Sequence, residues 1–156
     1  MKSFTLTTEI KVFAMNELSE NYRLLVLEAQ KATLRSYAPY SHFQVGAAAL
    51  LEDGTIVTGT NQENAAYPSG LCAERTTLFY ANSQYPDLSL KALAITARTP
   101  DGELCHTPLT PCGACRQVMV ETEKRYGKPM RVLLCGSEEV YIAESARSLL
   151  PLSFDL

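Results

Sequence analysis

The spacing of hydrophobic residues divides the first part of the chain into a strand and a helix. Residues 4–14 alternate weakly between apolar and polar positions, which predicts a strand over that range. From Ser19 to about Arg35 the sequence is rich in helix formers, and apolar side chains recur at helical spacing. We expect this apolar stripe to pack against a hydrophobic core. It consists of Leu18, Tyr22, Leu25 and Ala29.

Two apolar segments on either side of a tight turn predict a β-hairpin. The segments are residues 43–51 and 55–61, and Glu52-Asp53-Gly54 lies between them. A short Asp-Gly turn between two hydrophobic runs is a strong hairpin signal.

The second half of the chain alternates predicted helices with predicted strands. Residues 72–84 favour a helix that ends before Pro86, and residues 112–125 favour another that Gly127 and Pro129 stop. Apolar runs predict strands at residues 90–98, 130–136 and 140–143, and a final helical turn at 144–150. This order of elements indicates a layered α/β domain with a mixed sheet.

Length and charge narrow the classes of function. The chain has 156 residues, which suits one domain, and no repeat or linker divides it. Its net charge is −3 and its isoelectric point is about 5.4, whereas binding to nucleic acid or to an anionic membrane needs a basic surface. We therefore expect a single domain over residues 1–156 that binds neither nucleic acid nor membrane, which leaves a small-molecule ligand.

The cysteine count points to a reducing compartment. The chain has five cysteines, an odd number, and its N-terminal residues have no apolar core of a signal peptide. The most apolar run, residues 45–51, is far shorter than the ~20 residues of a membrane span. We expect a cytoplasmic protein, in which clustered cysteines bind metal or take part in chemistry.

Three of the cysteines have the spacing of a metal site. Cys112 and Cys115 lie at a predicted helix start in "PCGACRQ", and Cys72 lies at another in "LCAER". A helix N-terminus favours the thiolate form that a metal requires. Tetrahedral zinc needs four ligands, so three protein ligands leave one position for water, as in catalytic sites. The sequence therefore predicts one catalytic Zn²⁺.

A fourth protein ligand would instead give a closed structural zinc site. Closed sites usually present paired C-x-x-C knuckles, and Cys72 has no such partner, so the open site is favoured. Cys135, inside a predicted strand, is expected to be a small buried hydrophobe, and His42 a loop residue. The candidates for a fourth ligand are Cys105, His106, Cys135 and His42.

Charged residues accompany both cysteine motifs. Glu74 could simply favour the helix dipole. Beside an open zinc position, however, a carboxylate can take a proton from zinc-bound water, leaving hydroxide, and pass that proton on. The combination of C-x-E with P-C-x-x-C favours this catalytic role. Arg75 is predicted to hydrogen-bond the thiolates and draw charge from the metal, whereas Arg116 suits that role and a structural one equally.

With these motifs, the sequence resembles the small zinc-dependent cytidine deaminases of the homotetrameric kind with three cysteine ligands. The similarity runs from about Tyr37 to Phe154 and includes "YSHFQVGAAALL", "GTNQENAAYPSGLCAER", "PCGACRQ" and "LLPLSF". In the wider class a histidine opens an H-x-E motif, and here Cys72 takes its place. The resemblance implies a three-layer α/β/α fold with a mixed sheet flanked by helices. Residues 1–15 fall outside it and are expected to form an added N-terminal strand.

The resemblance also implies which residues carry the chemistry. Cys72, Cys112 and Cys115 would bind one Zn²⁺ per subunit. Glu74 would carry a proton to N3 of the cytosine ring and then to the departing amine. Together these roles predict hydrolytic deamination of cytidine and 2′-deoxycytidine to uridine and 2′-deoxyuridine, a reaction of pyrimidine salvage.

A set of substrate contacts follows from the same resemblance. Phe43 would pack near the nucleoside, and Asn61 and Glu63 would hydrogen-bond a ribose hydroxyl. The amide of Ala73 would contact the base carbonyl, and the carbonyl of Thr110 would receive the leaving amino group. Independently of the resemblance, Asn61 and Glu63 stand two apart at a strand end, so their side chains should lean to one face.

The resemblance further implies a homotetramer in which subunits share their sites. Phe154 would stack on the base in a neighbouring subunit, although an apolar C-terminal residue can equally be a plug on the core. Tyr67 would lie at the interface or the rim of the site.

Two alternatives stay open at this point: a related zinc deaminase of another small substrate, such as blasticidin or free cytosine, and a non-catalytic zinc-stabilised module.

Overall fold

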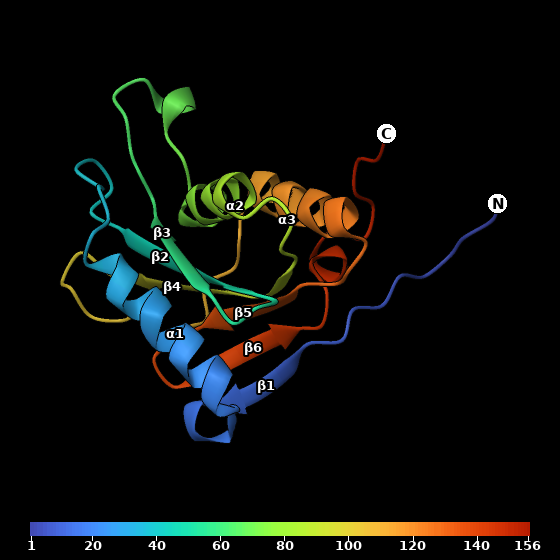
Figure 1. The fold of residues 1–156 in the computed structure, drawn as a ribbon, viewed down its shortest axis with the longest axis horizontal. Helices are drawn as coiled ribbons and strands as arrows, with labels where there is room; N and C mark the ends of the chain where they lie inside the picture. Colours follow the sequence, from blue (N-terminus) through green and yellow to red (C-terminus); the bar gives the residue numbers. More distant parts are fainter.

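A six-stranded mixed sheet crosses the middle of the protein in the computed structural model, which describes residues 1–156 (Figure 1). The strands are β1 (Lys11–Ala14), β2 (Gln44–Leu51), β3 (Ile56–Thr60), β4 (Leu90–Arg98), β5 (Arg131–Cys135) and β6 (Glu139–Ala143). Their order is β1-β6-β5-β4-β2-β3, and only β4 and β5 run parallel to each other. The sheet is therefore mixed, as predicted.

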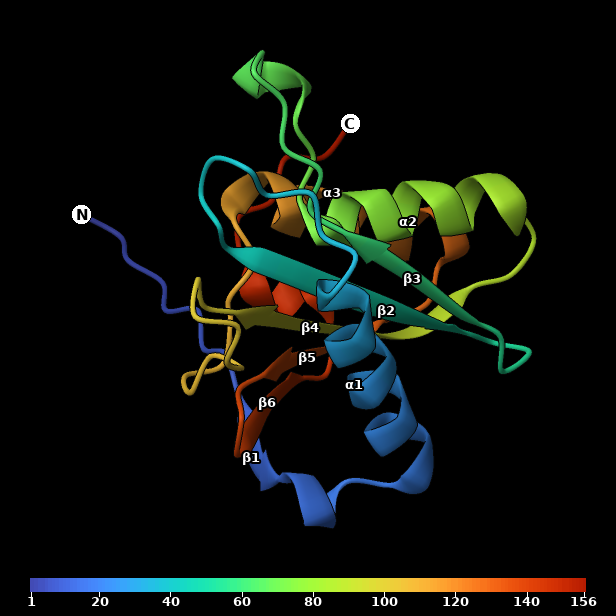
Figure 2. The same ribbon diagram turned by 90° about the vertical axis from the view of Figure 1, so that its left-hand side faces the viewer.

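Helices cover both faces of this sheet. The longer ones are α1 (Glu20–Thr33), α2 (Ala73–Gln84) and α3 (Gly113–Tyr126), and the short 3₁₀ helices are η1 (Met15–Glu17), η2 (Tyr67–Ser69) and η3 (Ala146–Leu149). Figure 1 shows α1 on one side of the sheet and α2 and α3 together on the other, and the turned view in Figure 2 agrees. The three-layer α/β/α fold is confirmed.

Strand β2 shows how the sheet joins two separate cores. Ala47 and Ala49 point into the larger core with Leu78 of α2 and Met119 of α3. The alternate position, Ala48, packs on the other side with α1 residues such as Leu25 and Ala29. Both faces of β2 are buried, which explains why its sequence is a continuous apolar run rather than an alternating one.

The predicted N-terminal strand is much shorter than expected. Residues 4–14 alternate along the sequence, but only Lys11–Ala14 form β1, and residues 1–10 have no regular secondary structure. β1 pairs antiparallel with β6, with Lys11 opposite Ile142. Because β6 ends at Ala143, which would lie opposite Ile10, residues before Ile10 have no partner strand to continue the ladder. No helix is long and apolar enough to cross a membrane.

The sheet places the starts of α2 and α3 near each other. Cys72 and Cys112 are the residues that immediately precede the two helices, as the sequence predicted. The segment between β3 and α2, residues 61–72, extends away from the body of the domain in both views (Figures 1 and 2). These two helix starts and this segment form the candidate site.

Candidate active site

Three thiols gather where α2 and α3 begin. The Sγ atoms of Cys72 and Cys112 are 3.9 Å apart, and those of Cys112 and Cys115 are 3.3 Å apart. All three lie within 4.8 Å of one another. Zinc–sulfur bonds of about 2.3 Å in a tetrahedron place ligand sulfurs about 3.8 Å apart, so the cluster fits one Zn²⁺.

No fourth side chain joins this cluster. The only group of three or more potential metal ligands is Cys72, Cys112 and Cys115. Cys135 is fully buried in β5, where burial raises its pKa to about 12, which agrees with the prediction of a small buried hydrophobe. His42 is an exposed loop residue with φ of 56°, and His106 pairs with Ser137 at 3.2 Å. The donor set therefore matches the open zinc site rather than the closed one.

The cluster already favours negative charge on sulfur. Hydrogen bonding from the Cys115 thiol, assisted by Arg75, lowers the pKa of Cys72 to about 5 despite its partial burial. The same contact raises the pKa of Cys115, because that thiol is the donor to the Cys72 thiolate. A cation bound here would displace thiol protons from the cluster.

Glu74 lies at the second position of α2 with only 4% of its surface exposed. Burial raises the pKa of its carboxyl, and the negative charge of Cys72 raises it further. A buried carboxyl beside a cation site, with a pKa above its usual value, is suited to accept a proton and pass it on. Its environment therefore suits a proton carrier better than a solvated first-turn glutamate.

The two arginines beside the cysteine motifs have different surroundings. Arg75 Nη2 approaches Cys72 Sγ at 3.8 Å and the Gly70 carbonyl at 3.5 Å, so its charge lies against the cluster. Arg116 instead donates from Nε to the Pro111 carbonyl and from Nη1 to the Leu149 carbonyl, both at 2.9 Å. Arg75 thus has the predicted contact with sulfur, and Arg116 has the structural role.

A glycine in β3 lets α2 approach the sheet closely enough to place Cys72. A Cβ on Gly59 would lie 2.4 Å from Thr77 Oγ1 and 2.7 Å from the Thr77 backbone nitrogen. Thr76 adds a hydrogen bond from its hydroxyl to the Thr60 carbonyl at 2.8 Å. The first turn of α2 is therefore seated directly on β3.

Gly59→Ala is expected to push α2 from the sheet and weaken both the fold and zinc binding. Overpacking of this kind costs about 1–3 kcal/mol, or roughly 2–4 °C in melting temperature per kcal/mol. Melting temperature and zinc content would be measured. The matched control is Gly113→Ala, because a Cβ there has no neighbour within 4 Å. Equal melting temperatures for the two variants would contradict this account of α2.

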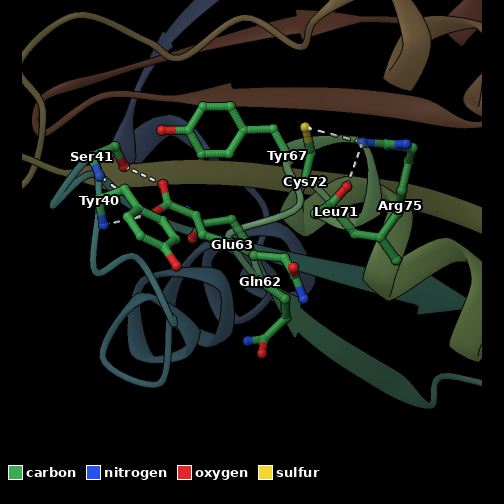
Figure 3. Close-up of a pocket in the computed structure, with 11 residues that line it drawn as sticks. Tyr40, Ser41, Gln62, Glu63, Tyr67, Leu71, Cys72 and Arg75 are labelled. Atoms are coloured by element: carbon green, nitrogen blue, oxygen red, sulfur yellow. Dashed lines mark hydrogen bonds between the residues drawn. The ribbon is translucent and has the colours of Figure 1, made fainter.

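A pocket of about 500 Å³ reaches Cys72 of the thiol cluster, and its volume suits a small molecule; Glu74, Cys112 and Cys115 do not line it. Its lining residues are Tyr40, Ser41, Asn61, Gln62, Glu63, Asn64, Tyr67, Gly70, Leu71, Cys72 and Arg75. Figure 3 shows Ser41 and Glu63 at one end, Cys72 and Arg75 at the other, and Tyr67 between them. The pocket thus joins the predicted sugar-binding residues to a predicted metal ligand.

Asn61 and Glu63 lie just past the end of β3, and both contact the segment before β2. Asn61 Oδ1 accepts hydrogen bonds from Ser36 Oγ and Val45 N, and Asn61 Nδ2 donates to the Phe43 carbonyl at 2.9 Å. The Glu63 carboxylate accepts from the amide of Tyr40 at 2.9 Å. Their side chains therefore lean toward the same segment, as the spacing predicted.

The other predicted substrate contacts lie outside the lining of this pocket. Phe43 is half-buried, Ala73 is fully buried at the start of α2 and Thr110 is exposed, and none of the three lines the pocket. Phe154 is 69% exposed. Its backbone is nevertheless held by Gln117, whose amide accepts from Phe154 N at 3.1 Å and donates to Phe154 O at 2.9 Å. Phe154 is thus no plug on the core of its own chain.

Sequence reasoning did not single out Tyr40, Ser41 or Gln117. The Tyr40 and Tyr67 rings meet edge to face at the pocket, with centroids 6.0 Å apart. Tyr40 and Ser41 belong to an irregular loop without periodicity, so no pattern indicated them. Gln117 stands within "PCGACRQ", but its partner lies 37 residues away at the C-terminus.

Comparison with known proteins decides the family. Residues 19–126 match the model of the cytidine and deoxycytidylate deaminase zinc-binding region. The chain belongs to this deaminase family. A curated cytidine deaminase of Sporosarcina psychrophila is 52% identical over 97 residues, which are 62% of this chain and 66% of that protein. The aligned part of this chain thus spans just under two thirds of that relative's length.

Solved structures of deaminases share the fold. The crystal structure of cytidine deaminase from Burkholderia pseudomallei matches with a TM-score of 0.71 and 40% identity, over 85% of this chain and 98% of that one. Cytidine deaminase from Mycobacterium tuberculosis matches with a TM-score of 0.67 and 34% identity, over 88% of this chain and all of the other. The Cys72–Cys112–Cys115 cluster of this family member lies within the zinc-binding region of the family model.

Proposed function

We propose that the protein deaminates cytidine and 2′-deoxycytidine by hydrolysis, with one Zn²⁺ per subunit. The observation that carries this proposal is the three-thiol cluster with the buried carboxyl of Glu74 beside it, and with Cys72 of the cluster at one end of a pocket. Cys72, Cys112 and Cys115 would hold the zinc. The ion would supply a water activated for attack at neutral pH.

Glu74 moves the protons of the reaction. It takes one from the attacking water and passes it to N3 of the cytosine ring, which makes C4 more electrophilic. It then takes the proton from the hydroxyl newly added at C4 and delivers it to the amino group, which leaves as ammonia while the ring carbonyl of uridine forms. One water is consumed and one ammonia is released. The amide of Ala73 would contact the base carbonyl and the Thr110 carbonyl the leaving amine.

The sugar contacts of the proposal rest on groups with spare hydrogen-bonding capacity. An asparagine amide has two N–H donors, and only one on Asn61 is used, by the Phe43 carbonyl. Hydrogen bonds from Ser41 and from the Tyr40 backbone lower the pKa of Glu63, so it stays an acceptor. Asn61 would therefore donate to a ribose hydroxyl and Glu63 would accept from one, with Phe43 packed against the nucleoside.

A direct test is the loss of absorbance near the cytosine band when the purified protein meets substrate. Cytidine and 2′-deoxycytidine are expected to react, and free cytosine and blasticidin far less, because they lack a ribose with its hydroxyls. Asn61→Ala is expected to lower kcat/KM for cytidine by about tenfold or more, because it removes the substrate hydrogen bond together with the three bonds that hold Asn61 to residues 36–45. Unchanged turnover in Asn61→Ala would exclude the nucleoside contact. Silence on all four substrates with one tightly held zinc would favour a non-catalytic module.

We further propose a homotetramer, in which Phe154 of one subunit reaches the site of its neighbour. Supporting this, Phe154 is exposed while Gln117 fixes its backbone, and Tyr67 at the pocket is 76% exposed. Light scattering would test the assembly. We also propose a cytoplasmic location, which the five free cysteines suit, and a role in pyrimidine salvage there.

A further inference from the structure

Ser41 connects two parts of the pocket through one hydroxyl group. Its Oγ donates to Glu63 Oε1 and accepts from the Phe43 amide at 3.1 Å. Its own amide donates to Glu63 Oε2 at 3.3 Å, beside the Tyr40 amide at 2.9 Å. Figure 3 shows Ser41 and Tyr40 converging on the Glu63 carboxylate. The segment after β3 is thereby joined to the segment before β2.

These bonds determine how Glu63 presents its free lone pairs. A carboxylate has about four acceptor positions, and three hydrogen bonds from Tyr40 and Ser41 already engage it. The capacity that is left suits one further donor. Both amide donors hold Oε2, whereas the Ser41 hydroxyl is the donor to Oε1. Without that hydroxyl, Oε1 has no donor within the protein, and the carboxylate group can turn.

We propose that Ser41 is a positioning residue for sugar recognition, which orients Glu63 toward the 3′-hydroxyl of the nucleoside. This inference rests on the proposed function, in which Glu63 accepts from a ribose hydroxyl. Ser41 also fixes the Phe43 backbone, because it accepts from the Phe43 amide while Asn61 donates to the Phe43 carbonyl. One side chain thus sets the relative positions of two substrate contacts.

The alternative role for Ser41 is to stabilise only its own turn. A serine hydroxyl that accepts from the amide two residues later commonly stabilises a turn on its own. That role would not depend on Glu63, and its loss would affect every substrate equally. A positioning role instead affects only those substrates that carry the hydroxyl Glu63 recognises. The two roles therefore differ in substrate dependence.

The experiment compares cytidine with 3′-deoxycytidine, which lacks only the 3′-hydroxyl. Values of kcat/KM would be measured for the zinc-loaded wild type, Ser41→Ala and Ser41→Thr. Ser41→Ala is expected to lower the cytidine to 3′-deoxycytidine ratio by about 10- to 100-fold, the value of a hydrogen bond to a charged group. Ser41→Thr keeps the hydroxyl and is expected to restore most of the ratio. In a Glu63→Gln background, Ser41→Ala should change the ratio no further.

Several results would overturn the inference. An unchanged ratio in Ser41→Ala, or an equal loss on both substrates, would leave Ser41 with a turn-stabilising role alone. A ratio that Ser41→Ala lowers equally in the Glu63→Gln background would separate Ser41 from Glu63. If the wild type turns over cytidine and these results appear, only the inference fails. If the wild type does not turn over cytidine at all, the proposed function fails with it.

Discussion

Replacing Glu74 with glutamine is expected to abolish nearly all cytidine deamination while the protein keeps its zinc. Glutamine fills the same volume but cannot accept a proton and hand it on. Because Glu74 is almost fully buried, no solvent-exposed carboxylate can replace it. General acid–base catalysis contributes about 10²–10⁴-fold, so kcat should fall by at least that factor. Turnover would be followed by absorbance, and zinc would be measured per subunit.

A matched control for this variant is Glu20→Gln. Glu20 is also an acidic residue in the first turn of a helix, but it lies exposed at the start of α1, on the other face of the sheet. The Glu20→Gln substitution also removes a favourable negative charge at a helix N-terminus, worth about 0.3–1 kcal/mol, but it does not touch the site. Full activity in Glu20→Gln is therefore expected. An active Glu74→Gln enzyme would refute the proton-carrying role.

The regular elements were predictable because local sequence and tertiary contacts agree. β4, for example, is predicted at residues 90–98 and found at Leu90–Arg98, since a buried strand needs a continuous apolar run. The zinc cluster was predictable for a similar reason. Two of its ligands lie within one helical turn, and the third precedes another helix whose start the sequence also marks.

The N-terminal segment shows where such reasoning stops. Alternation over residues 4–14 is a property of the segment alone, but a strand exists only where a partner offers backbone groups. That partner, β6, ends at Ala143, which would lie opposite Ile10, so most of residues 4–10 have no partner and only Lys11–Ala14 are paired. The length of the strand is thus set by a segment more than 120 residues away in the sequence, which local pattern cannot reveal.

Side-chain contacts to irregular backbone were equally out of reach. Arg116 stayed undecided from the sequence because its partners are backbone carbonyls: that of Pro111, in an irregular segment, and that of Leu149, at the end of η3 and 33 residues away. The Ser41–Glu63 contact spans 22 residues between two such segments. The chemical identity of a site can therefore be inferred from its ligands, while the groups that orient those ligands require coordinates.

Cys112→Ala is expected to lose zinc and activity while the fold persists. Cys112 is exposed, so its replacement leaves no cavity, whereas the fully buried Cys115 also contributes to the core. Removing the Cys112 thiol leaves two protein ligands, too few for a three-ligand catalytic site. Mutations of outer-shell partners alone cost about 10–100-fold in metal affinity, and the loss of a direct ligand should exceed that. Zinc content per subunit and kcat would be measured together.

Cys105→Ala is the matched control, because Cys105 is a half-buried free thiol outside the cluster. Thermal denaturation with and without added zinc separates ligation from packing. A ligand that binds only the folded state stabilises it by about 2.7 kcal/mol at 100 times its Kd, so zinc should raise the melting temperature of the wild type and of Cys105→Ala. Cys112→Ala should show no such rise, because its remaining thiols cannot hold the ion tightly. If Cys112→Ala instead keeps one zinc and full turnover, the metal lies elsewhere and the three-thiol site is wrong.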